Sequence, residues 1–257
     1  MTLPFDTAGL PVIRRVRHEL KRRDLAVTRV ERLTPHMIRV TLWGPDMDDF
    51  VSAAPDDHIK LFFPGEADQP EMRDYTPRRF DADGFLVLDF VDHEAGPAAD
   101  WARAALPGDR LQIGGPRGSA VVEGDIAAWL LIGDETALPA IGRRIEELAP
   151  GVPVTSIVAV PGAADEQVFE SEAVHRAVWL HRPLEQATDP APYLEALRGV
   201  ELAPGTFVWI AAEAGVARAI RDYLTAERGL PLPWLKAAGY WVAGEADASV
   251  KSLEAEA

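Results

Sequence analysis

The sequence predicts two domains, an antiparallel β-barrel followed by an α/β domain built on a parallel sheet. Between Asp24 and Gly124, short apolar stretches are separated by Pro, Gly and Asp, a texture typical of small antiparallel barrels. From Ile126 onward, strand-like stretches alternate with helix-like ones, which is typical of a parallel sheet covered by helices. The 257 residues are enough for two domains of ordinary size.

The elements of each domain follow from these stretches. In the first domain we expect strands at residues 25–30, 37–42, 59–63, 85–91 and 110–113, and a short helix opening after Gly96 and Pro97. In the second we expect strands at 129–132, 154–160, 178–181 and 207–211, and helices at 138–148, 193–197 and 216–228.

These elements divide the chain into four segments. Residues 1–23 form a basic leader, 24–124 the β-barrel domain, 125–244 the α/β domain and 245–257 a flexible acidic tail. The leader contains six cations that we expect to be solvated, namely Arg14, Arg15, Arg17, Lys21, Arg22 and Arg23.

Composition limits the classes of function. The chain has no cysteine, which excludes disulfides and thiolate-bound iron–sulfur clusters, so a redox cofactor must be of another kind. A formal net charge of −15 argues against a nucleic-acid partner. No apolar run has the length of a membrane span, and the N-terminus lacks the apolar core of a secretory signal, so we expect a cytoplasmic protein.

The segment from Arg73 to Pro77 suits a flavin. Residues two apart on a strand share a face, so Arg73 and Tyr75 can contact one ligand while Asp74 points away. Arg73 can hold a pyrophosphate through its fork of donors, and Tyr75 can lie along the ribityl chain or the isoalloxazine edge. Thr76 offers a hydroxyl or an amide to the ring. An ordinary edge strand entering a turn remains the alternative.

The helix expected after Gly96 suits a diphosphate. The first turn of a helix carries free amides and the positive end of the dipole, and small residues let an anion approach the backbone. Here the first turn contains Pro97, Ala98 and Ala99, and Trp101 follows. A second phosphate site favours FAD over FMN.

Six segments in the same order resemble the siderophore-interacting proteins, or ferric-siderophore reductases, a branch of the ferredoxin-NADP reductase-like flavoproteins. They are residues 30–35, 58–64, 73–78, His93 with 96–101, 133–140 and 239–241. The resemblance covers about residues 25–244. It implies the two-domain ferredoxin-NADP reductase-like fold, FAD as cofactor and NAD(P)H as donor. It places Asp89 and His93 among the candidate FAD contacts, although a loop histidine is at least as often structural.

The resemblance also implies that the turn from Gly133 to Ala140 faces the nicotinamide dinucleotide. The candidate contacts there are Asp134, Glu135 and Thr136, of which Thr136 is favoured because the two carboxylates would repel a phosphate. Glu213 occupies the equivalent turn after a later strand, with a helix cap as the alternative role. Asp165 and Glu166, at the end of the second strand of this domain, favour NADH over NADPH, although Arg143, Arg144 or Arg218 could reach a 2'-phosphate.

A groove for a ferric siderophore should carry cations, because these chelates are often bulky anions. Lys60 and Lys236 are the candidates that the resemblance places near the substrate, with plain surface lysine as the alternative. Relatives commonly follow the Gly-Tyr-Trp segment with basic residues, whereas this chain has Val242-Ala243. This departure puts the identity of the siderophore in doubt, and Arg78 could compensate. No protein-bound metal is expected.

The resulting function is an NAD(P)H-dependent, FAD-containing ferric-siderophore reductase that releases Fe(II) inside the cell. Electron transfer belongs to the flavin, so no side chain is assigned as a catalytic acid or base. One alternative is an electron-transfer module that uses ferredoxin or flavodoxin as donor, or an acceptor other than a siderophore. The other is a non-catalytic siderophore-binding protein. We expect a monomer.

Overall fold

A computed structural model describes residues 9–64, 70–93 and 96–253, and these residues form two compact units. One unit is Ile13–Val121, and the other contains the chain from Val122 onward together with Val12 and the residues before it. The prediction of an antiparallel β domain followed by a parallel α/β domain is confirmed. None of the described helices is long and apolar enough to cross a lipid bilayer.

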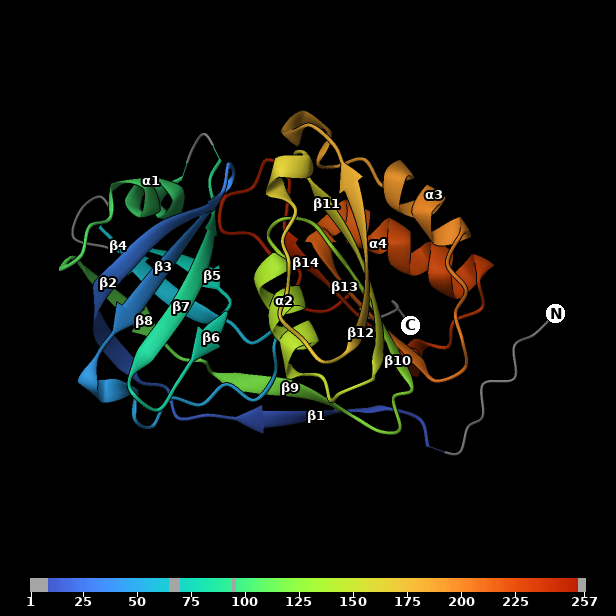
Figure 1. Ribbon diagram of the computed structural model, residues 1–257, viewed down its shortest axis with the longest axis horizontal. Helices are drawn as coiled ribbons and strands as arrows, with labels where there is room; N and C mark the ends of the chain where they lie inside the picture. Colours follow the sequence, from blue (N-terminus) through green and yellow to red (C-terminus); the bar gives the residue numbers. More distant parts are fainter. Residues whose placement is uncertain (1–8, 65–69, 94–95, 254–257) are drawn as a thin grey trace. The chain divides into compact units, whose positions relative to one another are not determined.

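The unit Ile13–Val121 is a half-barrel of antiparallel strands (Figure 1). Seven strands lie in the order β5-β4-β8-β2-β3-β7-β6, and β1 pairs separately with β9. The bounds are β1 Val12–Arg17, β2 Arg22–Thr34, β3 Met37–Trp43, β4 Ile59–Phe63, β5 Glu71–Tyr75, β6 Arg79–Phe80, β7 Phe85–Val91, β8 Arg110–Gly114 and β9 Gly118–Glu123, with helix α1 at Pro97–Ala104.

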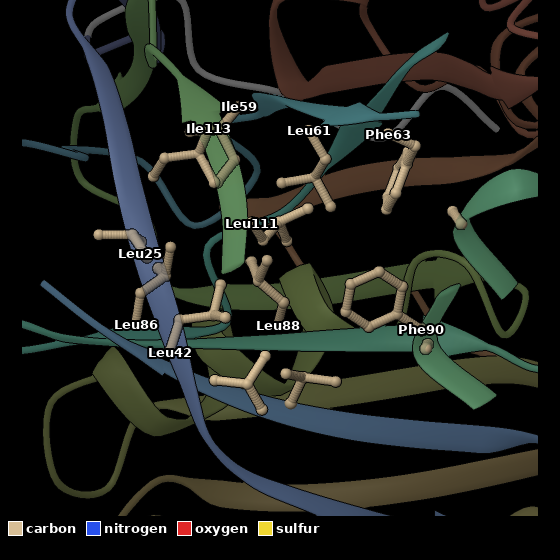
Figure 2. Packing of buried hydrophobic residues seen from close by; sticks show 14 of the residues in the cluster. Leu25, Leu42, Ile59, Leu61, Phe63, Leu86, Leu88, Phe90, Leu111 and Ile113 are labelled. Atoms are coloured by element: carbon tan, nitrogen blue, oxygen red, sulfur yellow. The ribbon is translucent and has the colours of Figure 1, made fainter. Parts of the chain in front are cut away.

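Alternation along these strands builds the core of the half-barrel. On β7, Leu86, Leu88 and Phe90 are fully buried. Side chains from β2, β3, β4 and β8 meet them in one apolar cluster, shown in Figure 2. Because side chains alternate across a strand, the intervening residues lie on the opposite face of the sheet, where Asp89 is also buried. This core fixes the positions of β5 and α1, which carry the predicted flavin contacts.

The second unit is a doubly wound parallel sheet in the order β12-β11-β10-β13-β14. Its elements are β10 Ala128–Gly133, α2 Leu138–Glu147, β11 Pro153–Val160, β12 Val174–His181, α3 Ala191–Arg198, β13 Thr206–Glu213, α4 Ala214–Asp222 and β14 Leu235–Trp241. Helix α2 lies on one face of the sheet, and α3 and α4 lie on the other (Figure 1). The strand order reverses at β10, so the ligand crevice expected for such sheets lies at the carboxyl ends of β10 and β13.

The two ends of the described chain differ from the expected leader and tail. Residues of the expected leader form β1 and the start of β2, and Arg23 is buried, where it donates to the carbonyl of Asp46 and to Asp49. In the expected tail, Val250 exchanges two backbone hydrogen bonds with Gly239, and Leu253 is buried. The expectation of solvation is therefore wrong for Arg23, whereas Arg14, Arg15, Arg17 and Arg22 are exposed as expected. The flexibility of the tail stays a prediction, although Val250 and Leu253 contact the rest of their unit. Residues 254–257 lie outside the described chain.

Candidate functional site

The segment Arg73 to Thr76 lies at the end of β5, an edge strand of the half-barrel. Arg73 is half-buried and donates to Glu71 Oε2 at 3.0 Å and to the carbonyl of Met72 at 2.8 Å. The half-buried Tyr75 ring packs on Phe90 of β7, with 4.5 Å between ring centroids. Burial raises the pKa of the Tyr75 phenol, so this hydroxyl stays protonated at neutral pH.

Helix α1 begins at Pro97 without a side-chain cap. Its N-cap is Gly96, at a φ of 138° that strongly favours glycine, and a Cβ there would come within 3.1 Å of His93 Cε1. The helix therefore starts beside the His93 ring, at Gly96, which has no side chain to block a ligand. Uncapped first-turn amides next to such a backbone fit a diphosphate, so this geometry suits FAD.

Phe90 joins these two segments. Its ring lies 4.5 Å from Tyr75 and 5.6 Å from Trp101 of α1, centroid to centroid, and Trp101 also packs on Phe63 at 5.9 Å. Trp101, a predicted cofactor contact, thus contributes to the packing of α1 onto the half-barrel. Phe90 was not among the predicted site residues, although its place in the alternating strand 85–91 marked it as a core residue.

Asp89 and Arg78 lie in the interior of the half-barrel unit. Both oxygens of Asp89 accept from Arg39, at 2.7 and 2.8 Å, and Arg78 Nε lies 3.9 Å from the same carboxylate. Asp89 is 3% exposed and Arg78 is 6% exposed. An Arg78 guanidinium buried to this degree is not accessible to a bulky chelate. Arg39, which carries the bidentate contact, was missed because nothing in the sequence links positions 39 and 89.

In the second unit, Asp134 ties together the carboxyl ends of three strands. Its Oδ1 accepts from the Thr136 amide and hydroxyl, at 2.9 and 2.5 Å. Its Oδ2 accepts from the Glu213 amide at 3.1 Å and from Trp241 Nε1 at 2.9 Å. Asp134 is 1% exposed, so all four bonds are made inside the protein. The predicted residues Asp134, Thr136 and Glu213 are brought together, but Asp134 faces the protein instead of a ligand.

Glu213 is the N-cap of α4. Its Oε2 accepts from the amides of Gly215 and Val216, at 2.6 and 3.0 Å, and its Oε1 from Ala243 at 3.3 Å. This is the capping role that the sequence left open as an alternative. The bond to Ala243 also holds the segment after β14 against the start of α4.

Glu135 forms a buried ion pair with Arg182, which follows β12. Arg182 Nη2 lies 2.8 Å from Glu135 Oε2, and the two residues are 3% and 5% exposed. Burial, reinforced by the neighbouring Asp134 carboxylate and opposed by Arg182, raises the pKa of Glu135 to about 7. Arg182 was not predicted, because its partner lies 47 residues away in the sequence.

The two predicted siderophore lysines lie on different units. Lys60 of β4 faces Asp74 of β5 across the strand pair, at 3.1 Å. Lys236 of β14 is half-buried and pairs in register with Trp209, about 16 Å before the carboxyl end of its strand at 3.3 Å per residue. It therefore stands apart from the Asp134 cluster. No group of three potential metal-ligating side chains occurs in the part of the chain that the structure describes.

Comparison with known proteins decides the family. A family model for the siderophore-interacting protein matches residues 126–244, and a model for the siderophore-interacting FAD-binding domain matches residues 26–71 and 64–120. The chain belongs to the siderophore-interacting protein family. The resemblance inferred from the sequence motifs is thus confirmed, and FAD is the cofactor for which the first domain of this family is named.

Members and more distant relatives agree with this assignment. The chain is 35% identical to the NADPH-dependent ferric-chelate reductase of Escherichia coli K12, over 88% of this chain and 95% of that protein. The crystal structure of a siderophore utilization protein from T. fusca has a TM-score of 0.83 and 38% identity, covering 93% of this chain and 98% of the other. The Amycolatopsis cytochrome P450 reductase GcoB, at 20% identity, shares the fold with a TM-score of 0.59 over 83% of this chain and 68% of its own.

Proposed function

We propose that this protein is an FAD-dependent oxidoreductase that takes hydride from NAD(P)H and reduces Fe(III) held by a siderophore. The observation that carries the proposal is the match of both domains to the siderophore-interacting family, together with a 35%-identical relative named as an NADPH-dependent ferric-chelate reductase. The residues at the end of β5 and the start of α1 fit the cofactor that this chemistry needs.

We assign FAD binding to the half-barrel unit. Arg73 supplies a cation for the diphosphate. The uncapped start of α1 supplies amide N–H donors at the positive end of the helix dipole. Tyr75, packed against Phe90 with the two rings tilted by 37°, offers an aromatic surface, and the buried Thr76 follows it. Gly96 keeps the backbone open for close approach.

The chemistry that bound FAD supplies is the conversion of a two-electron donor into one-electron reduction of Fe(III). The protein orients the donor and the acceptor, and no side chain is required as an acid or base. Fe(II) is a softer ion than Fe(III) and binds hard oxygen donors more weakly, so reduction releases the iron. We assign the donor site to the carboxyl ends of β10 and β13, where Thr136 and the start of α4 border the crevice.

An anaerobic titration tests the proposal. The purified flavoprotein is reduced with NADH or NADPH, a panel of ferric siderophores is added, and the flavin absorbance is followed with a chromogenic Fe(II) chelator present. We expect reoxidation of the flavin and release of Fe(II) for some members of the panel. A protein that binds no flavin but still binds ferric siderophore would establish the non-catalytic alternative.

A second class of acceptor is favoured by the residues predicted to bind the siderophore. Lys60 is paired with Asp74, Arg78 is buried, and Val242-Ala243 replaces the basic residues common in the family. These features lower the positive charge available to an anionic siderophore and favour a neutral or cationic ferric complex. The same panel therefore includes neutral and cationic ferric complexes, and reoxidation of the flavin by these but not by anionic siderophores would support this second class. An electron acceptor other than a siderophore would reoxidise the flavin where all siderophores fail.

The remaining partners and the location are also proposals. We propose a cytoplasmic monomer, tested by cell fractionation and by size-exclusion chromatography with light scattering. Ferredoxin is the alternative donor, and the formal net charge of −15 disfavours docking of a similarly acidic ferredoxin. Sluggish turnover with both nicotinamide nucleotides and salt-sensitive reduction by a ferredoxin would support that alternative.

A further inference from the structure

An exposed hydrogen bond between a histidine and a glutamate lies at the carboxyl end of the second and third strands of the parallel sheet. β11 ends at Val160 and β12 at His181, and these two residues are register partners. The amide of Arg182 then donates to the Val160 carbonyl at 3.0 Å. Just beyond β11, Glu166 Oε1 lies 2.8 Å from His181 Nε2. The side chains of His181 and Glu166 are 45% and 37% exposed, so both remain accessible to a ligand.

Of the other charged groups in residues 160–167 and 181–187, Asp165 and Arg182 are buried and Glu185 is exposed. Asp165 is 4% exposed, and its amide donates to the Gly162 carbonyl in a short turn. Arg182 is the only lysine or arginine in residues 160–167 and 181–187, and it is buried against Glu135. Two of its nitrogens, Nε and Nη1, have no hydrogen-bond partner in the described chain. The charge that these two segments present to solvent is therefore negative, from the carboxylates of Glu166 and Glu185, and no exposed guanidinium or ammonium accompanies them there.

This position matters for dinucleotide recognition. In open parallel sheets, a carboxylate near the end of the second strand accepts from the 2'-hydroxyl of the adenosine ribose, whereas a 2'-phosphate requires a nearby cation. A site with a carboxylate and no exposed guanidinium repels the 2'-phosphate. The hydrogen bond from His181 fixes the carboxylate at the strand ends, so that it is oriented before a ligand arrives.

We propose that Glu166, held by His181, is the residue that sets the coenzyme specificity of this protein and makes it prefer NADH to NADPH. The inference rests on the proposed function and names which donor that function uses. It sets this chain apart from the 35%-identical relative, whose name states NADPH dependence. The carboxylate accepts the 2'-hydroxyl of NADH, and Gly162, whose Cβ position faces open space, leaves the ribose room to approach.

Binding of the oxidised nucleotides tests the proposal without turnover. Isothermal titration calorimetry of the oxidised holoprotein with NAD⁺ and NADP⁺ gives the ratio of the two Kd values, and stopped-flow flavin reduction by NADH and NADPH gives the matching ratio of rates. We expect wild-type protein to bind NAD⁺ more tightly. In Glu166→Gln the preference should fall about tenfold, since a like charge a few ångströms from the phosphate is removed.

Glu172→Gln is the matched control. Glu172 is exposed and lies on the same unit, just before the amino end of β12, away from the carboxyl ends of the strands. The substitution therefore removes the same charge at a distance from the proposed site. This variant should keep the wild-type ratio. In Glu166→Lys, which places a cation at the strand ends, the preference should invert.

Three results would overturn the assignment. Tighter binding of NADP⁺ by wild-type protein would do so, and so would a Glu166→Gln ratio equal to that of Glu172→Gln. Failure of both nucleotides to bind or to reduce the flavin would overturn the nicotinamide donor itself. That result differs from equal use of both nucleotides, which contradicts only the role of Glu166.

Discussion

Asp134 accepts four hydrogen bonds from three different strand ends, and its carboxylate is fully buried. We therefore assign it as a positioning residue that fixes Thr136, the start of α4 and Trp241 around the donor site. In Asp134→Asn one oxygen becomes an amide nitrogen, which cannot accept. The two bonds that this oxygen accepts are lost, at a cost of roughly 1.5–3 kcal/mol for each bond to a charged acceptor.

We expect Asp134→Asn to raise the KM for the nicotinamide nucleotide about tenfold, as one lost contact of this strength would. The rate of flavin reoxidation by a ferric complex should stay near the wild-type value, because that half-reaction does not use the donor. Asp189→Asn is the control, since an amide oxygen there can still accept from the Ala191 amide at the start of α3. Equal loss in both half-reactions would instead point to general misfolding.

Glu135 gives the protein a pH-dependent stability term. Burial raises its pKa to about 7, from 4.5 in the unfolded chain. Between these two values the folded state retains a proton that the unfolded state releases. The contribution of Glu135 to the free energy of unfolding is therefore present below about pH 4.5 and is lost as the pH rises towards 7.

Glu135→Gln removes this titration. We expect the wild-type free energy of unfolding, minus that of the variant, to decrease from pH 5 to pH 7.5 by on the order of 1–3 kcal/mol, because only the wild type loses the contribution of Glu135. Above that range the difference should level off. Urea unfolding of the holoprotein at each pH, followed by tryptophan fluorescence, measures it. Curves that stay parallel across this range would show that Glu135 does not titrate there.

At the scale of single residues, the sequence predicted residue types better than their partners. Thr136 and Glu213 were placed correctly at the carboxyl edge of the sheet, because a turn after an apolar strand marks that edge. The buried pairs of Asp89 with Arg39 and of Glu135 with Arg182 join residues 50 and 47 positions apart. No local pattern specifies such pairs. The sequence therefore predicted Asp89 and Glu135 as ligand contacts without showing that each pairs with a buried arginine.

At the scale of elements, β4 and β5 set the charge beside the flavin segment. Lys60 and Asp74 are register partners on one face of this strand pair, opposite the face that carries Arg73 and Tyr75. The ion pair between them offsets the positive charge of Lys60. Asp74→Asn should therefore raise kcat/KM for an anionic ferric siderophore a few-fold, since about 1 kcal/mol is typical for one exposed charge pair.

The comparison for this element is Asp83→Asn, an equal change of charge in the turn before β7. It should have a smaller effect on kcat/KM, and Lys60→Met should lower the value for the same acceptor. If Asp74→Asn and Asp83→Asn act equally, the effect comes from net charge alone and Lys60 has no local role.

The elements at the chain ends were the least predictable. β1 is mostly exposed, and its Arg-rich sequence lacks the alternation of a half-buried strand. Its presence depends on pairing with β9, where Gly118 admits the backbone of Val16 at a distance that a Cβ would block. Residues 245–253 are held by Val250 and Leu253, two apolar residues in an otherwise polar stretch. Tertiary contacts, which composition does not report, determine both segments.

At the scale of the whole molecule, the two-domain order and the family were predictable because each domain has its own pattern of apolar and turn-forming residues. Spaced strands bounded by Pro and Gly indicate a barrel, and strand–helix alternation indicates a parallel sheet. The half-barrel boundary was expected at residue 124 and the compact unit ends at Val121. Boundaries shift by a few residues because β9 continues through the join, to Glu123.

Net charge gives a last prediction for the whole molecule. At −15, the protein repels an anionic ferric complex at long range, and salt screens this repulsion. We expect the second-order rate of flavin reoxidation by an anion such as ferric EDTA to rise a few-fold between roughly 10 and 150 mM ionic strength, over which the Debye length falls from about 30 to 8 Å. A cationic complex such as ferrioxamine B should show the opposite trend. Using flavin reduced beforehand removes the nucleotide from the measured step. A rate that falls with salt for the anion would mean that cations near the flavin, with Lys60 among them, outweigh the field of the whole protein and form an attractive groove.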